Sequence, residues 1–157
     1  MAAAKVNDFG LLDPGIHLMT LDEIAELFGR FQRSDRRLKL QDRLRQFVNA
    51  VWAVNARVDI YIDGSFIMTK VDEPGDIDVV LILPKEWDFT AELLPFQYNV
   101  VSKRMVRKLH GFDMLLGIEG QPTAQEAIDF FSKVNVKWYG PLGIPIGTLK
   151  GLIKVLQ

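Results

Sequence analysis

Two short motifs near the middle of the chain carry residue types suited to phosphate chemistry. Gly64-Ser65 is separated by ten residues from the pair Asp76 and Asp78. On an extended strand, two residues separated by one other residue point to the same face, so these two carboxylates would lie about 7 Å apart along the chain. Such a pair can bind a divalent metal, and a small Gly-Ser turn lets backbone N–H groups approach a phosphate.

A third acid, Asp113, interrupts the apolar segment 111–117 at its centre. An acid inside an apolar strand is costly to bury unless it has a partner, and the alternative is an edge-strand acid that faces water. Two-metal nucleotidyl transfer uses carboxylates that hold two Mg²⁺ ions about 4 Å apart, and Mg²⁺ prefers oxygen ligands. We therefore predict that Asp76, Asp78 and Asp113 are both catalytic residues and metal ligands. Asp113 would also accept the proton of the attacking hydroxyl group, and the Gly-Ser turn would bind a triphosphate.

The hydrophobic periodicity predicts a single α/β domain that spans residues 1–157. We expect an irregular lead-in at 1–19, N-terminal helices at 20–55, core strands at 56–117, and a C-terminal helix and strand at 118–157. Strands are predicted at 58–64, 76–83, 111–117 and 152–156, and helices at 20–29, 35–54, 99–109 and 123–133. These elements indicate a palm-like mixed sheet of about four to five strands with helices packed on it.

Capping residues indicate where three of the helices begin. Thr20 and Glu23 form a capping box, Ser34 or Asp35 would cap the second helix, and Thr123 would cap the last. The second helix also carries a run of basic residues in its first half, Arg33, Arg36, Arg37, Lys39, Arg43 and Arg45. A solvated helix face is the favoured interpretation of this run, and a phosphate-binding or partner-binding surface is the alternative.

Composition excludes several classes of protein. The 157 residues are 48% hydrophobic and 25% charged, which is typical of a globular domain. The chain has no cysteine, so any metal must be bound by oxygen or histidine, and its net charge of −1 argues against sequence-blind nucleic-acid binding. The longest apolar run near the middle is too short for a membrane span, and the first residues lack the apolar core of a signal peptide. We expect a cytoplasmic protein without a membrane partner.

Other polar residues give weaker signals. His17 is expected to make a structural hydrogen bond, while His110 precedes the Asp113 segment and could reach the site. Lys150 follows a glycine-rich turn and could contact a triphosphate, although a lysine in this position is more often solvated. A hydrolase based on Ser65 is rejected because the sequence around it is no nucleophile elbow.

The spacing of these motifs resembles the signature of the DNA polymerase beta-like nucleotidyltransferase superfamily. That signature is an apolar residue, Gly, Gly or Ser, a spacer of about ten residues, and then Asp-apolar-Asp/Glu-apolar. Within the superfamily, the chain looks like a poorly characterised bacterial nucleotidyltransferase-like family. The matching segments are Pro14 to His17, Tyr61 to Phe66, Pro74 to Asp78, Asp113, and Lys150 to Ile153.

The resemblance implies a minimal palm-like mixed sheet with helices on one face. It also implies metal ligands at Asp76, Asp78 and, less directly, Asp113, with Mg²⁺ or Mn²⁺ as cofactor. The activity would be transfer of a nucleoside monophosphate from an NTP to a protein, RNA or small-molecule acceptor, with release of pyrophosphate. Some small relatives are antitoxins that AMPylate a partner toxin, but here Phe66-Ile67-Met68 replaces the Arg-containing stretch that often follows their Gly-Ser.

Three hypotheses follow from the sequence. The first is an active Mg²⁺-dependent nucleotidyltransferase, which requires Asp76 and Asp78 to share an open site. The second is a nucleotide-binding or partner-binding module on the same fold, with weak or no catalysis, such as an antitoxin-like protein. In that case Asp113 is expected to turn away or to pair with a lysine. The third is an unrelated α/β fold in which the acids coincide by chance.

Overall fold

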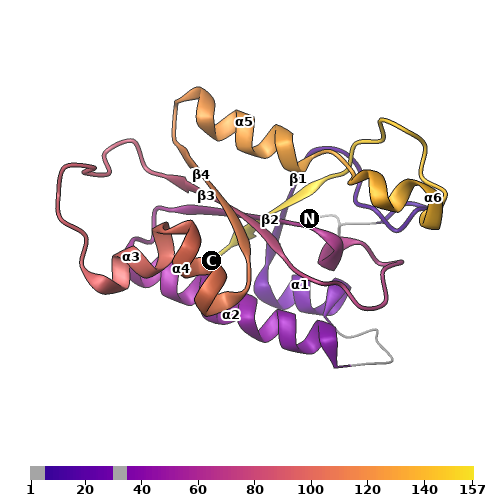
Figure 1. Cartoon of the computed structure of the whole chain (residues 1–157), viewed down its shortest axis with the longest axis horizontal. Helices are drawn as coiled ribbons and strands as arrows, with labels where there is room; N and C mark the ends of the chain where they lie inside the picture. Colours follow the sequence, from indigo (N-terminus) through magenta and orange to yellow (C-terminus); the bar gives the residue numbers. More distant parts are fainter. Residues whose placement is uncertain (1–5, 30–34) are drawn as a thin grey trace.

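A five-stranded mixed sheet forms the centre of the protein (Figure 1). The computed structural model describes residues 6–29 and 35–157. The strands are β1 (Ile16–Thr20), β2 (Asp59–Asp63), β3 (Asp78–Leu83), β4 (Asp113–Ile118) and β5 (Leu152–Leu156). Their spatial order is β1-β5-β2-β3-β4. The predicted single α/β domain with a mixed sheet is therefore confirmed.

The directions of the strands decide which residues meet at one end of the sheet. The central strand β2 runs antiparallel to both β5 and β3. The outer strands pair in parallel, β1 with β5 and β4 with β3. The C-terminal end of β2 therefore lies beside the N-terminal ends of β3 and β4. Both polar motifs of the sequence occur at this end.

Helices cover both faces of the sheet. The described residues contain α1 (Leu21–Phe28), α2 (Arg36–Val54), α3 (Pro95–Val101), α4 (Lys103–His110), α5 (Pro122–Phe131), α6 (Tyr139–Leu142), and the short 3₁₀ turns η1 (Ser65–Ile67) and η2 (Val136–Trp138). Figure 1 shows α1 to α4 below the sheet and α5 above it. The expectation that all helices lie on one face is therefore wrong for α5.

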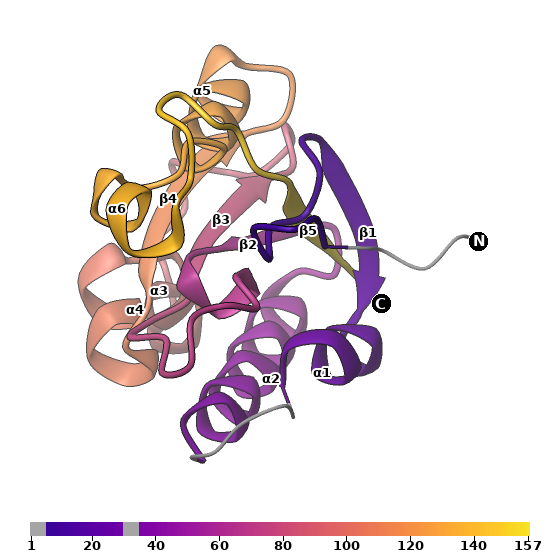
Figure 2. The same ribbon diagram turned by 90° about the vertical axis from the view of Figure 1, so that its right-hand side faces the viewer.

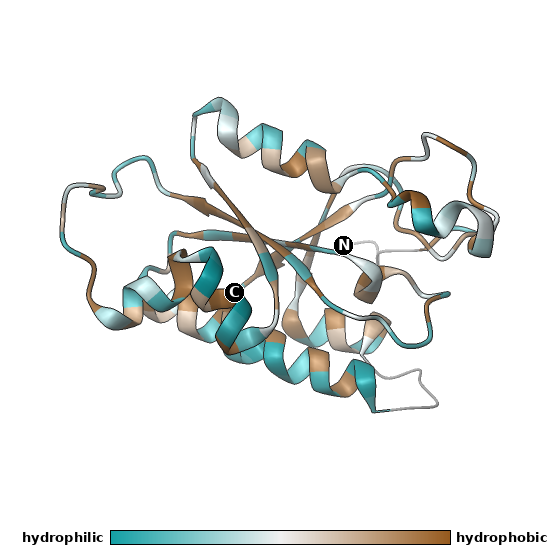
Figure 3. Ribbon diagram, in the orientation of Figure 1, coloured by the Kyte–Doolittle hydropathy of each residue, from teal (hydrophilic) through white to brown (hydrophobic). Residues whose placement is uncertain are grey.

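Two apolar layers hold these helices on the sheet. Val79 and Leu81 of β3 belong to the large core cluster between the sheet and α1 to α4. Val80 and Ile82 belong to the smaller cluster between the sheet and α5. Strand β3 is thus buried on both faces, as its nearly continuous apolar sequence predicts. Helix α2 alternates between hydrophobic and hydrophilic bands along its length (Figure 3). None of the helices among residues 6–29 and 35–157 has the length and apolar character needed to span a bilayer.

The capping residues explain most of the helix starts. The box formed by Thr20 and Glu23 is present at α1, where the Thr20 side chain accepts a hydrogen bond from the Glu23 N–H. Asp35 occupies the N-cap of α2 without a side-chain cap, and Ser34 lies outside the described residues. Thr123 does not cap α5 as predicted. That helix begins at Pro122, and the Thr123 hydroxyl accepts a hydrogen bond from the Ile118 N–H instead.

Three predicted boundaries are wrong. The irregular lead-in at 1–19 contains β1, a strand that is stabilised by parallel pairing with β5 at the other end of the chain. Segment 99–109 is not one helix, because Ser102 is extended and ends α3 while its side chain caps α4. The C-terminal segment 118–157, predicted to hold one helix and one strand, also contains η2 and α6 between α5 and β5. Each of these features depends on contacts that hydrophobic periodicity does not reveal.

Candidate functional site

Three aspartates lie side by side on three neighbouring strands, β2, β3 and the edge strand β4. Asp63 ends β2, Asp78 begins β3 and Asp113 begins β4, and the pairing register places Asp78 opposite both of the others. Asp76 lies in the segment just before β3. One carboxylate oxygen from each of Asp76, Asp78 and Asp113 lies within 4.8 Å of the others. The structure therefore brings together the three acids that were selected from the sequence.

Two details of that selection need correction. Asp76 is not part of the strand, so its carboxylate reaches the site from a loop rather than by strand alternation. Asp113 is the first residue of β4 and not its centre, and its side chain is 66% exposed. The Asp113 carboxylate is thus accessible to solvent, and the argument that it is buried inside a strand does not apply.

Gly64 forms the turn that brings the Gly-Ser motif against the acids. Its φ of 93° lies in the region that favours glycine. A Cβ atom at this position would lie 3.1 Å from the Asp78 backbone nitrogen and 3.2 Å from its Oδ2 atom. The turn therefore lies directly against Asp78, and Ser65, which starts η1, lines the cleft beside the acids.

A buried ion pair that the sequence did not reveal lies directly behind this turn. Lys150 Nζ is 2.6 Å from Asp63 Oδ1, and the two side chains are only 6% and 3% exposed. The prediction that Lys150 is solvated is therefore wrong. The signal for Asp63 was present, because this residue precedes Gly64 in the motif Tyr-Ile-Asp-Gly-Ser. No sequence pattern linked it to a lysine 87 positions later.

Burial and mutual repulsion perturb the acids. Burial of the Asp78 carboxyl group, reinforced by the nearby carboxylates of Asp63 and Asp76, raises its pKa to about 6. Burial also raises the pKa of Asp76, an effect opposed by hydrogen bonds from the Ile77 N–H and Arg107. The pKa of Asp63 is likewise raised by burial, and the Lys150 ammonium opposes that rise. Carboxylates with raised pKa values at one place are typical of functional sites.

The acids open into a cleft of about 870 Å³. Its lining includes Gly64, Ser65 and the three acids, together with Lys133, Lys137 and Trp138 from the segment that follows α5. Lys137 Nζ lies 5.1 Å from the centre of the Trp138 ring. Figure 1 shows this segment and the loop that leads into β3 at the same end of the sheet, and Figure 2 looks onto that end. The cleft combines carboxylates with cations and aromatic surface.

Two arginines of α2 hold the loop that connects the Gly-Ser turn to the acids. Arg37 is fully buried and donates hydrogen bonds to the carbonyl oxygens of Phe28, Phe66, Met68 and Val71. Arg36 donates to the carbonyl oxygens of Pro74 and Gly75, just before Asp76. Neither interpretation of the basic run describes these two residues. They position the site from beneath, and burial lowers the pKa of Arg37 to about 10.

Arg107, on α4, makes a direct contact with the acids that the sequence did not reveal. Its Nη1 atom is 2.6 Å from Asp76 Oδ2 and 3.2 Å from Asp113 Oδ1. Asp113 has therefore not turned away, but it pairs with a basic side chain, here an arginine rather than a lysine. This geometry meets the requirement of the catalytic hypothesis for a shared site. It also contains the pairing expected for a non-catalytic module.

The histidines lie outside this constellation. His17 Nε2 is 2.7 Å from the Asp13 carbonyl oxygen, in agreement with a structural role. His110 packs against the rings of Phe47 and Phe112, and burial lowers its pKa. It does not line the cleft. The suggestion that His110 reaches the site is therefore wrong.

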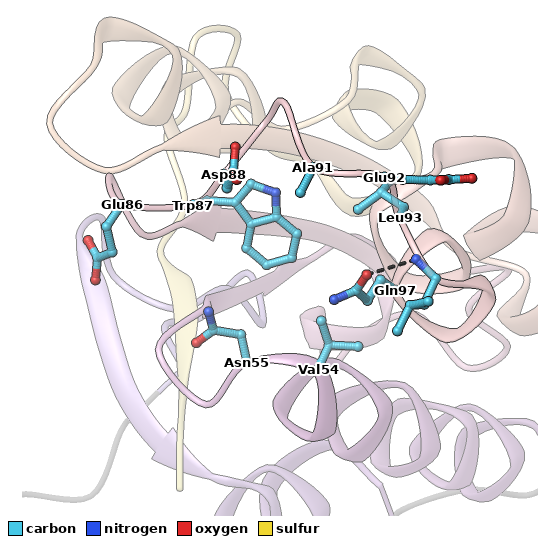
Figure 4. A pocket seen from close by; sticks show the side chains of 10 residues that line it. Val54, Asn55, Glu86, Trp87, Asp88, Ala91, Glu92, Leu93 and Gln97 are labelled. Atoms are coloured by element: carbon cyan, nitrogen blue, oxygen red, sulfur yellow. Dashed lines mark hydrogen bonds between the residues drawn. The ribbon is translucent and has the colours of Figure 1, made fainter.

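A second, smaller cavity of about 350 Å³ lies near the C-terminal end of α2 and the start of α3. Figure 4 shows Trp87 above Val54 in this cavity, while Glu86, Asp88 and Glu92 point away from one another. Among the described residues, the only group of three or more potential metal ligands is that of Asp76, Asp78 and Asp113. The 870 Å³ cleft is therefore the candidate functional site.

The chain belongs to the DUF6932 family, a family of unknown function whose model matches residues 4–155. No curated protein and no solved structure matches the chain. Because the family has no known function, a function for this chain is inferred from the site itself.

Proposed function

We propose that the protein is a Mg²⁺-dependent nucleotidyltransferase that transfers a nucleoside monophosphate from an NTP to a hydroxyl-bearing acceptor. The observation that carries the proposal is the convergence of Asp76, Asp78 and Asp113 within 4.8 Å beside the Gly64-Ser65 turn. The spacing of the same residues in the sequence resembles the nucleotidyltransferase signature. The spacing in the sequence and the arrangement in space thus support the same chemistry.

The residues present fit a hard divalent cation. The donor set consists of carboxylate oxygens only, and two of the three acids are partly buried while Asp113 faces the opening. Mg²⁺ takes oxygen ligands and usually keeps waters and substrate phosphates in its shell, so three acids are sufficient. When bound, Mg²⁺ supplies positive charge that stabilises negative charge on the phosphates. Mn²⁺ accepts the same ligands.

Other residues of the cleft provide for the remainder of a nucleotide. We assign the Ser65 hydroxyl and N–H to a phosphate oxygen, because Ser65 starts the 3₁₀ turn beside the acids and lines the same cleft. Lys133 and Lys137 line the same cleft and supply positive charge for a triphosphate. Trp138 offers an aromatic face on which a base can stack.

The proposed reaction forms a bond between the acceptor oxygen and the α-phosphorus and breaks the bond between the α-phosphorus and the bridging oxygen. Pyrophosphate leaves, and the proton of the acceptor hydroxyl group goes to Asp113. This carboxylate is suited to the role because its side chain is 66% exposed at the mouth of the site. The acceptor is a protein, an RNA or a small molecule.

One observation favours a second candidate function. The ion pair between Arg107 and Asp113 is the kind of contact expected in a module that binds nucleotides or a partner without transferring a nucleotide. Such a module would retain the cleft and its lysines. Nucleotide binding without transfer would distinguish it from the enzyme.

Transfer is tested by incubating the protein with each α-³²P-labelled NTP, Mg²⁺ and cell extract, and then looking for labelled protein or RNA on gels. The matched variants are the double substitution Asp76→Asn with Asp78→Asn and, as a control, Asp8→Asn at an exposed turn that does not line the cleft. We expect labelling with the native protein and with the control but not with the double variant. Metal-dependent thermal stabilisation by an NTP, without any labelling, would support the module and contradict the enzyme.

A further inference from the structure

Arg107 occupies the space between two of the carboxylates assigned to the metal. A single atom, Nη1, contacts Asp76 Oδ2 at 2.6 Å, Asp113 Oδ1 at 3.2 Å and the Gly111 carbonyl oxygen at 3.1 Å. The guanidinium group therefore provides, within the chain itself, the positive charge that this group of acids requires. Without such a charge the acids would repel one another.

We propose that the Arg107 guanidinium group takes the place of the divalent cation in the metal-free protein. It holds the acids together there, and a bound metal displaces it. This inference rests on the proposed function, because it requires the acids to be metal ligands. It adds a regulatory property of that site. The apparent metal affinity is the result of a competition between the metal and the protein's own arginine.

The competition follows from the oxygen atoms of Asp76. Its Oδ1 atom accepts a hydrogen bond from the Ile77 backbone N–H at 2.7 Å, which holds the carboxylate in place. Its Oδ2 atom is the one that Arg107 contacts at 2.6 Å. Nη1 lies between Asp76 Oδ2 and Asp113 Oδ1, so a metal that bridges these two oxygens would take the position of Nη1. The guanidinium group must then move before both carboxylates can bind the same ion.

The exposure of Arg107 makes this displacement inexpensive. Its side chain is 59% exposed, and Asp113 on the other side of the contact is 66% exposed. Ion pairs of this kind contribute little because water solvates both partners once they separate. The other cations near the site differ in this respect. Arg37 is fully buried on four carbonyl oxygens, and Lys150 is buried against Asp63, so both are fixed parts of the fold.

Measurement of Mn²⁺ binding to the metal-free full-length protein tests the proposal. Free Mn²⁺ is followed by electron paramagnetic resonance for the native protein, for Arg107→Gln and for Lys108→Gln, which removes the same charge from the next position of α4. We expect Arg107→Gln to bind Mn²⁺ about three- to tenfold more tightly than the native protein, the range for release of a weak ion pair. Lys108→Gln should change the affinity by less than about twofold.

Thermal unfolding of the metal-free proteins provides a second readout. Arg107→Gln should melt below the native protein, because the acids lose their internal cation, and saturating Mn²⁺ should remove most of this difference. Equal or weaker Mn²⁺ binding by Arg107→Gln than by the native protein would overturn the proposal. Binding of Mn²⁺ by Arg107→Gln but not by the native protein would also overturn the proposal, because a metal would then be unable to displace the arginine from the site. Failure of both proteins to bind Mn²⁺ would contradict the metal site itself, and with it the proposed enzyme.

Discussion

The acids of the site should destabilise the metal-free protein, and replacement of Asp78 by asparagine should reveal by how much. Burial and the neighbouring carboxylates raise the pKa of Asp78 from its ordinary value of 3.8 to about 6. Since each pKa unit corresponds to about 1.36 kcal/mol, the ionised form costs at most about 3 kcal/mol in the folded state. The side chain is partly open to the cleft, so we expect about 1–2 kcal/mol.

The sign of the pH dependence follows from the direction of the pKa change. A carboxyl group with a raised pKa in the folded state favours folding below its unfolded pKa, and this contribution is lost as the pH rises through about 6. At pH 7.5 the Asp78→Asn variant should therefore be more stable than the native protein, with a Tm about 2–8 °C higher. The difference should shrink as the pH falls and vanish only below the unfolded value of 3.8, where Asp78 is protonated in both states.

The assay is thermal and urea unfolding in the presence of a chelator at pH 4.5 and pH 7.5, with Asp8→Asn as the control for loss of an exposed charge. Mg²⁺ should then stabilise the native protein but not Asp78→Asn. If Asp78→Asn is less stable than the native protein at pH 7.5, or if the difference does not depend on pH, the reasoning about repulsion among the acids is refuted.

Two further predictions concern the fixed cations, and urea unfolding measures both. Lys150→Met should lower the free energy of unfolding by about 3–5 kcal/mol because it leaves Asp63 buried without its partner; a loss below about 1 kcal/mol would show that the pair is not closed to water. Arg37→Ala should cost about 3 kcal/mol or more, since buried carbonyl oxygens lose their donor, whereas Arg45→Ala at an exposed ion pair with Asp22 should cost less than about 1 kcal/mol. Equal losses for the two arginine variants would contradict the positioning role of Arg37.

Local patterns in the sequence determined much of the fold. Alternation and apolar runs gave the central strands β2 and β3, because a strand buried in a sheet needs an apolar face wherever it lies. The capping box at Thr20 located the start of α1, since that interaction involves neighbouring residues only. The position of β1 was missed because this strand is half exposed and depends on β5, which is more than a hundred residues away.

The candidate site divides in the same way. The sequence by itself pointed to the Gly64-Ser65 turn and to the acids Asp76, Asp78 and Asp113, because their residue types and spacing can be read without the fold. Only the tertiary structure decided which cations serve them. The pairing of Asp63 with Lys150 and the place of Arg107 between Asp76 and Asp113 both depend on sheet order and helix packing. Charges interact through space, and separations of 31 and 87 residues along the chain leave no periodic trace.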